Sequence, residues 1–355
     1  MSKQSYLKER LKTLPDFVFT YIQSDYDGES VNTQIAYSID ITIFLTFLKR
    51  YKFPDVESLD QFTVEHLEQV TVDDLINFKS YLREYEITTH TVSGQQVSRT
   101  VRNSNYGINR KLSAIRGLYS YLYKTDKISQ NVTDKITFTN INTKIKKPLT
   151  TQETIRILDV IFNGENYYTG RDLTEYRKRK QRDITIFTTY LGTGIRVSEL
   201  VNLNIYDISF DTSSFIVTRK GGAQQEIFMP VQVEQEIRTY LEERIKIDAA
   251  DKNALFVSRN GKRITVGTVE RNLKRYCYTA GVTHSDKTRP HALRRTFACR
   301  MLEDGVDIKM VAELMGHKNI EVTHKFYAQY SSQRRKDVMR NFQIIQDAAP
   351  QNFAK

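Results

Sequence analysis

Apolar side chains recur at helical spacing in four segments of the N-terminal part of the chain. The first segment, 3–24, is interrupted near Pro15, because proline removes a backbone donor and breaks a helix. The strongest pattern covers 31–51, where one apolar stripe is expected to face a core. Two more helices are predicted over 72–85 and 103–124. These patterns predict an all-helical N-terminal part.

The rest of the chain combines helical patterns with one hairpin pattern. Residues 214–229 are rich in β-branched and aromatic side chains around Gly221-Gly222, which is typical of a β-hairpin. The fold class predicted is therefore mainly α, with a small antiparallel β-sheet. A short buried strand is predicted over 254–257, and helices over 151–161, 183–191 (ended by the Gly192–Gly194 turn), 231–247, 266–280, from Pro290, over 308–315, from about 319 and over 332–346.

Length and a polar stretch predict the domain organisation. A chain of 355 residues is too long for one small core and is typical of two domains. Residues 141–150 are polar and contain three lysines and a proline, as expected of a linker. We therefore predict a helical domain over 1–140, a basic linker over 141–150, a second domain over 151–330, and a C-terminal helix and tail over 331–355.

Composition narrows the class of protein. Hydrophobic residues make up 39% and charged residues 27%, as in soluble globular proteins. The chain has no apolar run of about 18 residues, and its first residues carry charges where a signal peptide is apolar, so we expect a cytoplasmic protein with no membrane partner. Cys277 and Cys299 are too few for a disulfide framework, and the histidines show no metal-ligand spacing. No cofactor or metal is expected.

The net charge of +11 is unevenly distributed along the chain. Residues 1–98 carry 9 basic and 15 acidic side chains, a balance of −6, whereas 99–147 carry 11 and 2, a balance of +9. The remainder, 148–355, carries 33 and 25, a balance of +8. A local excess of positive charge indicates a surface that binds a polyanion, rather than charge that only keeps the protein soluble.

Three basic segments are candidates for contacts with DNA. The predicted helix 103–124 has an apolar stripe with cationic side chains away from it, and such a helix is suited to lie along a duplex. A linker rich in lysine can follow a phosphate backbone, and a run of like charges is otherwise solvated. The candidates are Arg99, Arg102, Arg110, Lys111, Arg116, Lys144, Lys146, Lys147, Arg177, Lys178 and Arg179.

Candidate chemistry gathers in the C-terminal part. His291 and Arg294 are three residues apart, so they share one face of the helix that Pro290 begins. His317 follows the glycine that ends the next predicted helix, and Tyr327 lies ten residues further on. Arginine, histidine and tyrosine together suit a phosphodiester, as charge stabiliser, proton carrier and nucleophile. Each residue taken alone is also compatible with an ordinary structural role.

Two further residues upstream extend this set. Arg196 is predicted at a helix N-terminus behind a glycine turn, where backbone N–H groups and a guanidinium can both face an anion. Glu199, three residues later, is expected to hold Arg196 from behind. Lys220 is next to the hairpin turn, from which a lysine can reach a site and donate a proton to a leaving oxygen.

These segments resemble the tyrosine recombinase (integrase) family. The resemblance is carried by GTGIRVSEL, RKGG, HALRRTFA, MGH and HKFYAQY, covers about 151–346, and extends to the helical first domain. Arg295 stands where the family often has histidine. The histidine-to-tyrosine spacing is nine or ten, and Tyr327 is preferred to Tyr330 as nucleophile. The family order of arginine, lysine, histidine, arginine, histidine and tyrosine is met by Arg196, Lys220, His291, Arg294, His317 and Tyr327.

The resemblance implies a mechanism and partners. Tyr327 would form a 3′-phosphotyrosyl link with double-stranded DNA at a specific core site, and neither ATP nor a metal would be needed. It also implies a two-domain clamp around the duplex and a homo-tetramer on two DNA sites, with the C-terminal segment docking on a neighbouring protomer. An accessory protein that controls direction is compatible with this pattern. Integration or excision of a mobile element and resolution of chromosome dimers both fit.

Two other functions remain open from the sequence. A type IB topoisomerase would use the same set of side chains as a monomer without a paired site. A non-enzymatic DNA-binding regulator would form no covalent link to DNA. Formation of a covalent link, its dependence on a DNA site and tetramer formation distinguish these alternatives from a recombinase.

Overall fold

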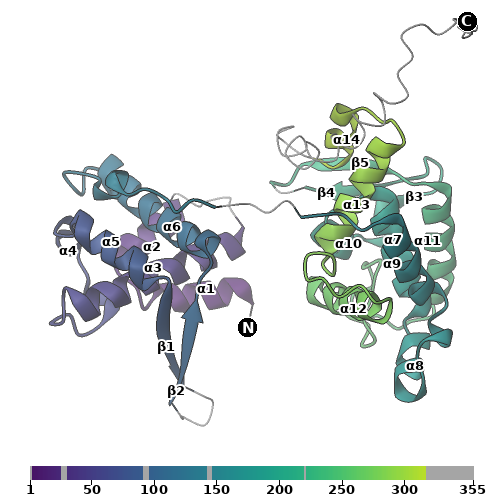
Figure 1. Cartoon of the computed structure of the whole chain (residues 1–355), viewed down its shortest axis with the longest axis horizontal. Helices are drawn as coiled ribbons and strands as arrows, with labels where there is room; N and C mark the ends of the chain where they lie inside the picture. Colours follow the sequence, from purple (N-terminus) through teal and green to yellow (C-terminus); the bar gives the residue numbers. More distant parts are fainter. Residues whose placement is uncertain (1, 25–29, 91–95, 142–145, 220, 317–355) are drawn as a thin grey trace, which may run out of the picture. The chain divides into compact units, whose positions relative to one another are not determined.

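The computed structural model describes residues 2–24, 30–90, 96–141, 146–219 and 221–316. The chain divides into two compact units, Met1–Thr143 and Lys144–Lys355 (Figure 1). Both consist mainly of helices, with a two-stranded sheet in the first unit and a three-stranded sheet in the second. The mainly α fold with small antiparallel sheets is therefore confirmed.

The N-terminal unit is built around one long helix, α3 (Val31–Tyr51). Its apolar side packs against α1, α2 and α6, and Ile41, Phe44 and Leu48 are fully buried. The helix begins at Ser30, whose side chain accepts from the amide of Thr33. The other helices of this unit are α1 (Lys3–Leu11), α2 (Asp16–Ser24), η1 (Leu59–Gln61), α4 (Val64–Glu68), α5 (Val72–Tyr81), α6 (Asn105–Lys124) and η2 (Val132–Lys135).

By length and composition α3 would also be able to cross a membrane. Its polar side chains are mostly uncharged, which keeps its mean hydropathy high although no uninterrupted apolar run exists. In the structure its buried residues are part of the core of the N-terminal unit. This is the environment of a core helix in a globular domain.

A β-hairpin in the N-terminal unit was not predicted. The helix expected over 72–85 ends at Tyr81, and β1 (Glu84–His90) then pairs antiparallel with β2 (Gln96–Arg102). Most side chains of β2 are exposed, whereas β1 begins with a short alternation in which Tyr85 is buried and Glu84 and Glu86 are exposed. This alternation covers only four residues, 84–87, and β-branched residues in the two strands add to the signal.

The C-terminal unit is organised around α9 (Lys180–Thr193), which packs against α7 (Thr151–Phe162), α11 (Val231–Arg244) and α13 (Pro290–Glu303) (Figure 1). Its side chains from Asp183 to Tyr190 are buried, as a central helix requires. Remaining elements are η3 (Gly164–Asn166), α8 (Gly170–Arg177), α10 (Val197–Asn202), η4 (Ile205–Asp207), β3 (Ile208–Ser209), β4 (Ser214–Thr218), β5 (Gln224–Phe228), α12 (Val266–Thr279) and α14 (Ile308–Leu314).

The predicted hairpin of this unit is present, and a third strand extends it. The order is β3-β4-β5, all antiparallel, with Phe215 opposite Ile227 on the buried face. Two expectations were wrong. Residues 254–257 form isolated bridges to Asn204 and Arg263 rather than a strand, because the chain there is buried but not paired along its length. In addition, α9 continues through Gly192 and ends only at Gly194.

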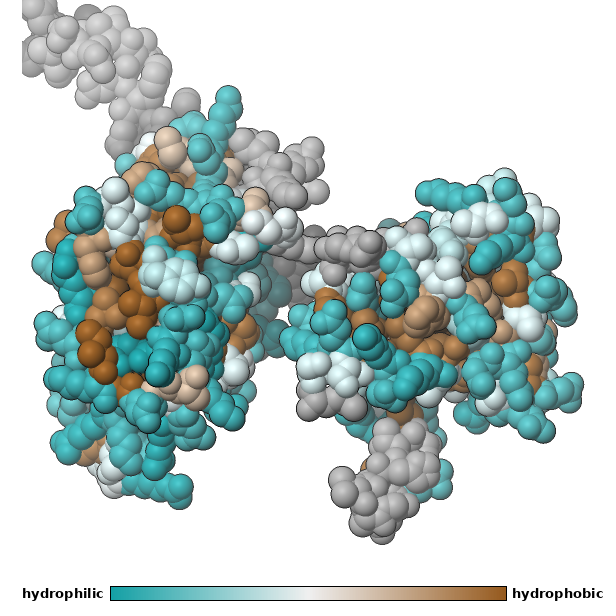
Figure 2. Space-filling view, turned by 180° about the vertical axis from the view of Figure 1, so that it is seen from behind, coloured by the Kyte–Doolittle hydropathy of each residue, from teal (hydrophilic) through white to brown (hydrophobic). Residues whose placement is uncertain are grey.

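Surfaces of both units are mixed in character. Hydrophilic side chains cover most of the face shown in Figure 2, with smaller hydrophobic areas between them. Mixed surfaces of this kind are ordinary for globular proteins. Function is therefore better argued from the charged side chains than from apolar patches.

Candidate active site

Arg196 lies at the sharp turn between α9 and α10. Gly194 ends α9 with a positive φ of 62°, and the ring of Phe297 occupies the space that a side chain at this position would need. The backbone N–H of Arg196 donates to Glu199 Oε2 at 2.8 Å, and its Nη1 donates to Oε1 at 2.8 Å. Glu199 thus orients Arg196 as expected. The Arg196 side chain remains 33% exposed and able to meet a ligand.

Arg294 approaches the same place from α13. Pro290 occupies the first turn of this helix, and the Arg294 guanidinium donates to the carbonyl groups of Gly194 and Met315. Burial, with the nearby charge of Arg196, lowers the pKa of Arg294 to about 10. The guanidinium therefore stays charged at neutral pH. Arg196 donates to the carbonyl of Gly316 at 3.0 Å, so the two arginines bind consecutive carbonyl groups.

His291 precedes Arg294 by one helical turn and is exposed. Although the residue is exposed, the protein on one side of the ring reduces its solvation and lowers the pKa of His291, and the positive charges of Arg294, Arg295 and Lys146 lower it further. The imidazole is therefore neutral at physiological pH, which suits a group that accepts a proton. An added anionic ligand would oppose this effect.

Arg219 is a residue of this site that the sequence analysis missed. It follows β4, and its Nη1 donates to Glu199 Oε2 at 2.6 Å. Its Nε donates to Gln225 at 2.8 Å, and its Nη2 to the carbonyl of Leu314 at 3.3 Å. Only 9% of the side chain is exposed. The sequence gives little signal for this, because an arginine beside a hairpin turn is normally solvated.

Glu199 connects the two arginines that flank it. Burial by itself would raise the pKa of Glu199, but hydrogen bonds from Arg196 and Arg219 lower it below its ordinary value. The carboxylate is therefore ionised. It is the acidic partner that these two guanidinium groups share.

Three predicted site residues, Lys220, His317 and Tyr327, lie outside the described residues, as does Tyr330. Lys220 directly follows Arg219 in the chain, and His317 directly follows Gly316. The described residues bring together Arg196, Arg294 and the beginning of this C-terminal segment, with His291 one turn from Arg294.

The basic side of α6 is exposed only in part, and its cations have partners within the N-terminal unit. Lys111 is buried and donates to Asn103 Oδ1 at 3.0 Å. Arg110 forms a bidentate pair, at 2.5 and 2.8 Å, with Asp40 of α3, which is fully buried. Arg116 donates to two backbone carbonyl groups and lies over the ring of Phe138. These three side chains stabilise the N-terminal unit itself.

The other candidate DNA contacts differ in their surroundings. Arg99 is exposed on β2, and Arg102 forms an exposed ion pair with Glu84. Lys146 and Lys147 are exposed, with Lys146 3.8 Å from Asp286, and Lys144 lies outside the described residues. Arg177 is exposed, as is Lys178, which pairs with Glu175. Surface pairs of this kind break readily when phosphate is offered.

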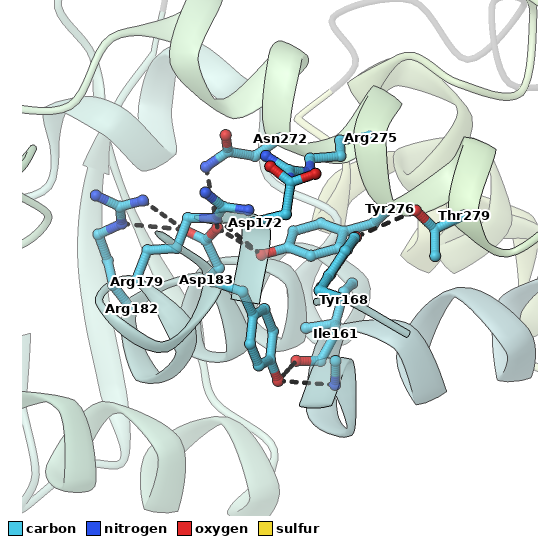
Figure 3. Close-up of polar contacts among 12 residues, drawn as sticks. Ile161, Tyr168, Asp172, Arg179, Arg182, Asp183, Asn272, Arg275, Tyr276 and Thr279 are labelled. Carbon is cyan, nitrogen blue, oxygen red and sulfur yellow. Dashed lines mark hydrogen bonds and ion pairs between the residues drawn. The ribbon is translucent and has the colours of Figure 1, made fainter. Parts of the chain in front are cut away.

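Arg179, by contrast, belongs to a buried polar cluster (Figure 3). The side chain of Asp183 is 1% exposed and accepts from Arg182 at 2.7 Å, Tyr276 at 2.8 Å and Asn272 at 2.9 Å. Arg179 lies 3.4 Å from the same carboxylate and is 13% exposed. Burial raises the pKa of the Tyr276 hydroxyl, which keeps its proton and donates. The expectation that Arg179 faces DNA is therefore wrong, because its charge balances Asp183.

Comparison with known proteins gives the same picture. A protein-family model described as "Phage integrase family" matches residues 169–334. Tyrosine recombinase XerC of Caldanaerobacter subterraneus is 31% identical, over 90% of this chain and 84% of the relative. Tyrosine recombinase XerS of Lactococcus lactis is 30% identical, over 89% and 92% respectively.

Two solved structures share the fold. The XerH site-specific recombinase bound to a palindromic difH substrate has a TM-score of 0.62 and 19% identity, over 88% of this chain and 80% of XerH. A lambda integrase dimer bound to a COC′ core site has a TM-score of 0.61 and 16% identity, over 94% and 98%. Since the XerC relative aligns along most of both sequences, the chain belongs to the tyrosine recombinase family.

Proposed function

We propose that this site-specific recombinase cuts and rejoins double-stranded DNA at a specific core site through Tyr327. The phenolic oxygen attacks phosphorus, the bond from phosphorus to the 5′ oxygen breaks, and a 3′-phosphotyrosyl link and a free 5′-hydroxyl result. The 5′-hydroxyl of a partner strand then attacks the link and releases the tyrosine. Because the link conserves the bond energy, neither ATP nor a metal is required.

The observation that carries this proposal is the meeting of Arg196 and Arg294 at the end of α14. With Arg219 they place three positive charges around the single carboxylate of Glu199, an excess of two positive charges. Backbone carbonyl groups satisfy donors without cancelling a full charge. Arg196, one-third exposed, is positioned to bind a phosphate oxygen, and charge on a pentacoordinate phosphorus is stabilised most by such fixed donors.

The remaining roles complete the reaction. Lys220, next to Arg219, donates the proton to the leaving 5′ oxygen, while His317 stabilises the phosphorus intermediate beside the two arginines. His291, whose pKa is lowered, is neutral at physiological pH and assists proton transfer. Each proton released by the tyrosine is thereby matched by one accepted at the leaving oxygen.

The proposed assembly is four protomers on two DNA sites, with 331–355 of each docking on a neighbour. Exposed cations such as Arg99, Arg177 and Lys147 would contact the phosphate backbone in this assembly. An accessory protein that sets direction would act on this complex. Integration or excision of a mobile element and resolution of chromosome dimers use the same chemistry.

Covalent capture tests the proposal. Purified protein is mixed with fragmented DNA from its source in EDTA and quenched with SDS, and the DNA that is attached to protein is sequenced. Tyr327→Phe and the control Tyr330→Phe are treated in parallel. One discrete sequence that is lost only in Tyr327→Phe is the expected result. Capture that persists in Tyr327→Phe, or that is scattered over all sequences, would contradict the assigned nucleophile or the site specificity.

A further inference from the structure

Arg219 contacts three separate parts of the C-terminal unit. Its Nη1 binds Glu199 on α10 at 2.6 Å, and its Nε binds Gln225 on β5 at 2.8 Å. Its Nη2 binds the carbonyl of Leu314, at the end of α14, at 3.3 Å. A planar guanidinium with several fixed donors is suited to this kind of bridging, which a lysine cannot reproduce.

Three consecutive carbonyl groups at the end of α14 each accept from a different arginine. Leu314 accepts from Arg219, Met315 from Arg294 and Gly316 from Arg196. The carbonyl end of a helix carries partial negative charge, which favours guanidinium groups there. These arginines come from the hairpin, from α13 and from the start of α10. The end of α14 is thus tied to the three elements that carry these arginines.

Packing between Gly316 and Arg219 is close, and it leaves no room for a side chain at position 316. Gly316 has a φ of 60°, and a side chain at this position would lie 2.7 Å from the guanidinium carbon of Arg219. Gln225 also donates to the carbonyl of Glu313 at 3.2 Å, which ties the hairpin to α14 a second time. The buried Arg219 side chain therefore fills the space between β4, Glu199 and the residue that precedes His317.

We infer that Arg219 is a positioning residue for Arg196, an inference that rests on the proposed function. Glu199 Oε1 accepts a hydrogen bond from the Arg196 guanidinium. Glu199 Oε2 accepts from the Arg219 guanidinium and from the backbone N–H of Arg196. Loss of Arg219 removes one partner of the carboxylate and releases the Leu314 carbonyl. Glu199 and the Gly316 carbonyl, the two groups that hold the Arg196 guanidinium, are then less firmly positioned, although Arg196 itself is intact.

The test compares two substrates in single-turnover cleavage, using synthetic duplexes with the sequence recovered by covalent capture. One duplex carries the natural scissile phosphate and the other an uncharged methylphosphonate at the same position. Because the methylphosphonate develops one negative charge fewer, a correctly placed Arg196 contributes less to its cleavage. Variants are Arg219→Gln, Arg219→Lys, Arg196→Gln and the Arg196→Gln/Arg219→Gln double variant. The matched control is Arg244→Gln, another buried arginine bound to backbone carbonyl groups in this unit.

On the phosphate duplex, Arg219→Gln is expected to slow cleavage roughly 10- to 100-fold with unchanged DNA affinity, since a small misplacement of a catalytic group has this effect. On the methylphosphonate duplex the defect of Arg219→Gln should shrink, as should that of Arg196→Gln. On the phosphate duplex the double variant should be little slower than Arg196→Gln alone, because the two residues act together. Arg219→Lys, which keeps the charge, should remain slow and serves as the decisive variant if Arg219→Gln does not fold.

A different set of results would overturn the inference. Equal defects of the Arg219 variants on both duplexes, as expected for Arg244→Gln, would make Arg219 an ordinary structural arginine. Cleavage rates of the Arg219 variants equal to that of the wild type would show that Arg219 has no role in cleavage. The proposed function is judged separately, by whether Tyr327→Phe abolishes covalent capture, so a failure of one conclusion is distinguishable from a failure of the other.

Discussion

Replacing Asp183 by asparagine is the sharpest available perturbation of the C-terminal unit. The change keeps the shape of the side chain and removes its charge. Asp183 is 1% exposed, and both Arg179 and Arg182 are 13% exposed at the side chain. After the substitution, two largely buried guanidinium groups lose their shared anion. The hydroxyl of Tyr276 and the amide of Asn272 lose a charged acceptor as well.

The size of the effect follows from this burial. Removing one partner of a buried ion pair costs about 3–5 kcal/mol, because the remaining charge is left uncompensated. For a unit of about 200 residues, each kcal/mol lowers Tm by roughly 2–4 °C, so Tm should fall by roughly 6–20 °C. Asp172→Asn is a matched control, since Asp172 pairs with Arg275 at 2.7 Å but is 65% exposed. An exposed pair of this kind contributes about 0–1 kcal/mol.

Thermal and urea unfolding of the whole chain, followed by circular dichroism, provide the assay. The transition that Asp183→Asn shifts should be the one that belongs to the C-terminal unit, while Asp172→Asn should leave every transition within a few degrees of wild type. Similar shifts for the two variants would refute the reasoning, because burial would then not determine the contribution of the ion pair. Arg179→Gln should destabilise in the same way, rather than act on DNA affinity alone.

Two further predictions concern the active site and its supporting turn. Covalent capture should weaken as the pH falls through the pKa of His291, which lies below its ordinary value of 6.5. Lys146→Gln removes one neighbouring positive charge, so the pKa of His291 should rise and the loss should begin at higher pH; a shift toward lower pH would contradict this sign. Gly194→Ala combines a positive φ with a collision against Phe297 and should lower Tm far more than Gly281→Ala, where the φ is also positive but the space is open; equal shifts, measured by thermal unfolding, would exclude the collision as the cause.

Local patterns were sufficient for most of the helical framework. The spacing of apolar residues predicted α3 with its bounds, and the turn at Gly221-Gly222 predicted the β4–β5 hairpin. The three-residue spacing of Arg196 and Glu199 also predicted their contact. In each case the interaction is determined within one turn or one hairpin, and such interactions repeat in any chain with the same pattern.

Partners distant in sequence could not be predicted. Arg110 is exposed as expected, but its pairing with Asp40 of α3, 70 residues earlier, was not predicted. Arg179 was expected to contact DNA, yet besides Asp183, one turn away, it meets the hydroxyl of Tyr276, 97 residues later in the chain. Nothing in the sequence indicates which cation finds a buried acid, because that choice depends on how helices pack. The β1–β2 hairpin was missed for a different reason: its apolar pattern is confined to Tyr85 and Ile87 of β1, while most of β2 is exposed.

The described arginines can nevertheless be sorted by their surroundings into structural and functional ones. Around Asp183, two guanidinium groups are each only 13% exposed, so their charge is used internally. At the end of α14, two guanidinium groups share the carboxylate of Glu199, and a third, that of Arg294, binds only carbonyl groups, which cancel no full charge. Arg196 is one-third exposed there, which opens the excess positive charge to an incoming anion. Charge excess together with exposure of one member, rather than the number of arginines, distinguishes a site for phosphate from a structural ion pair.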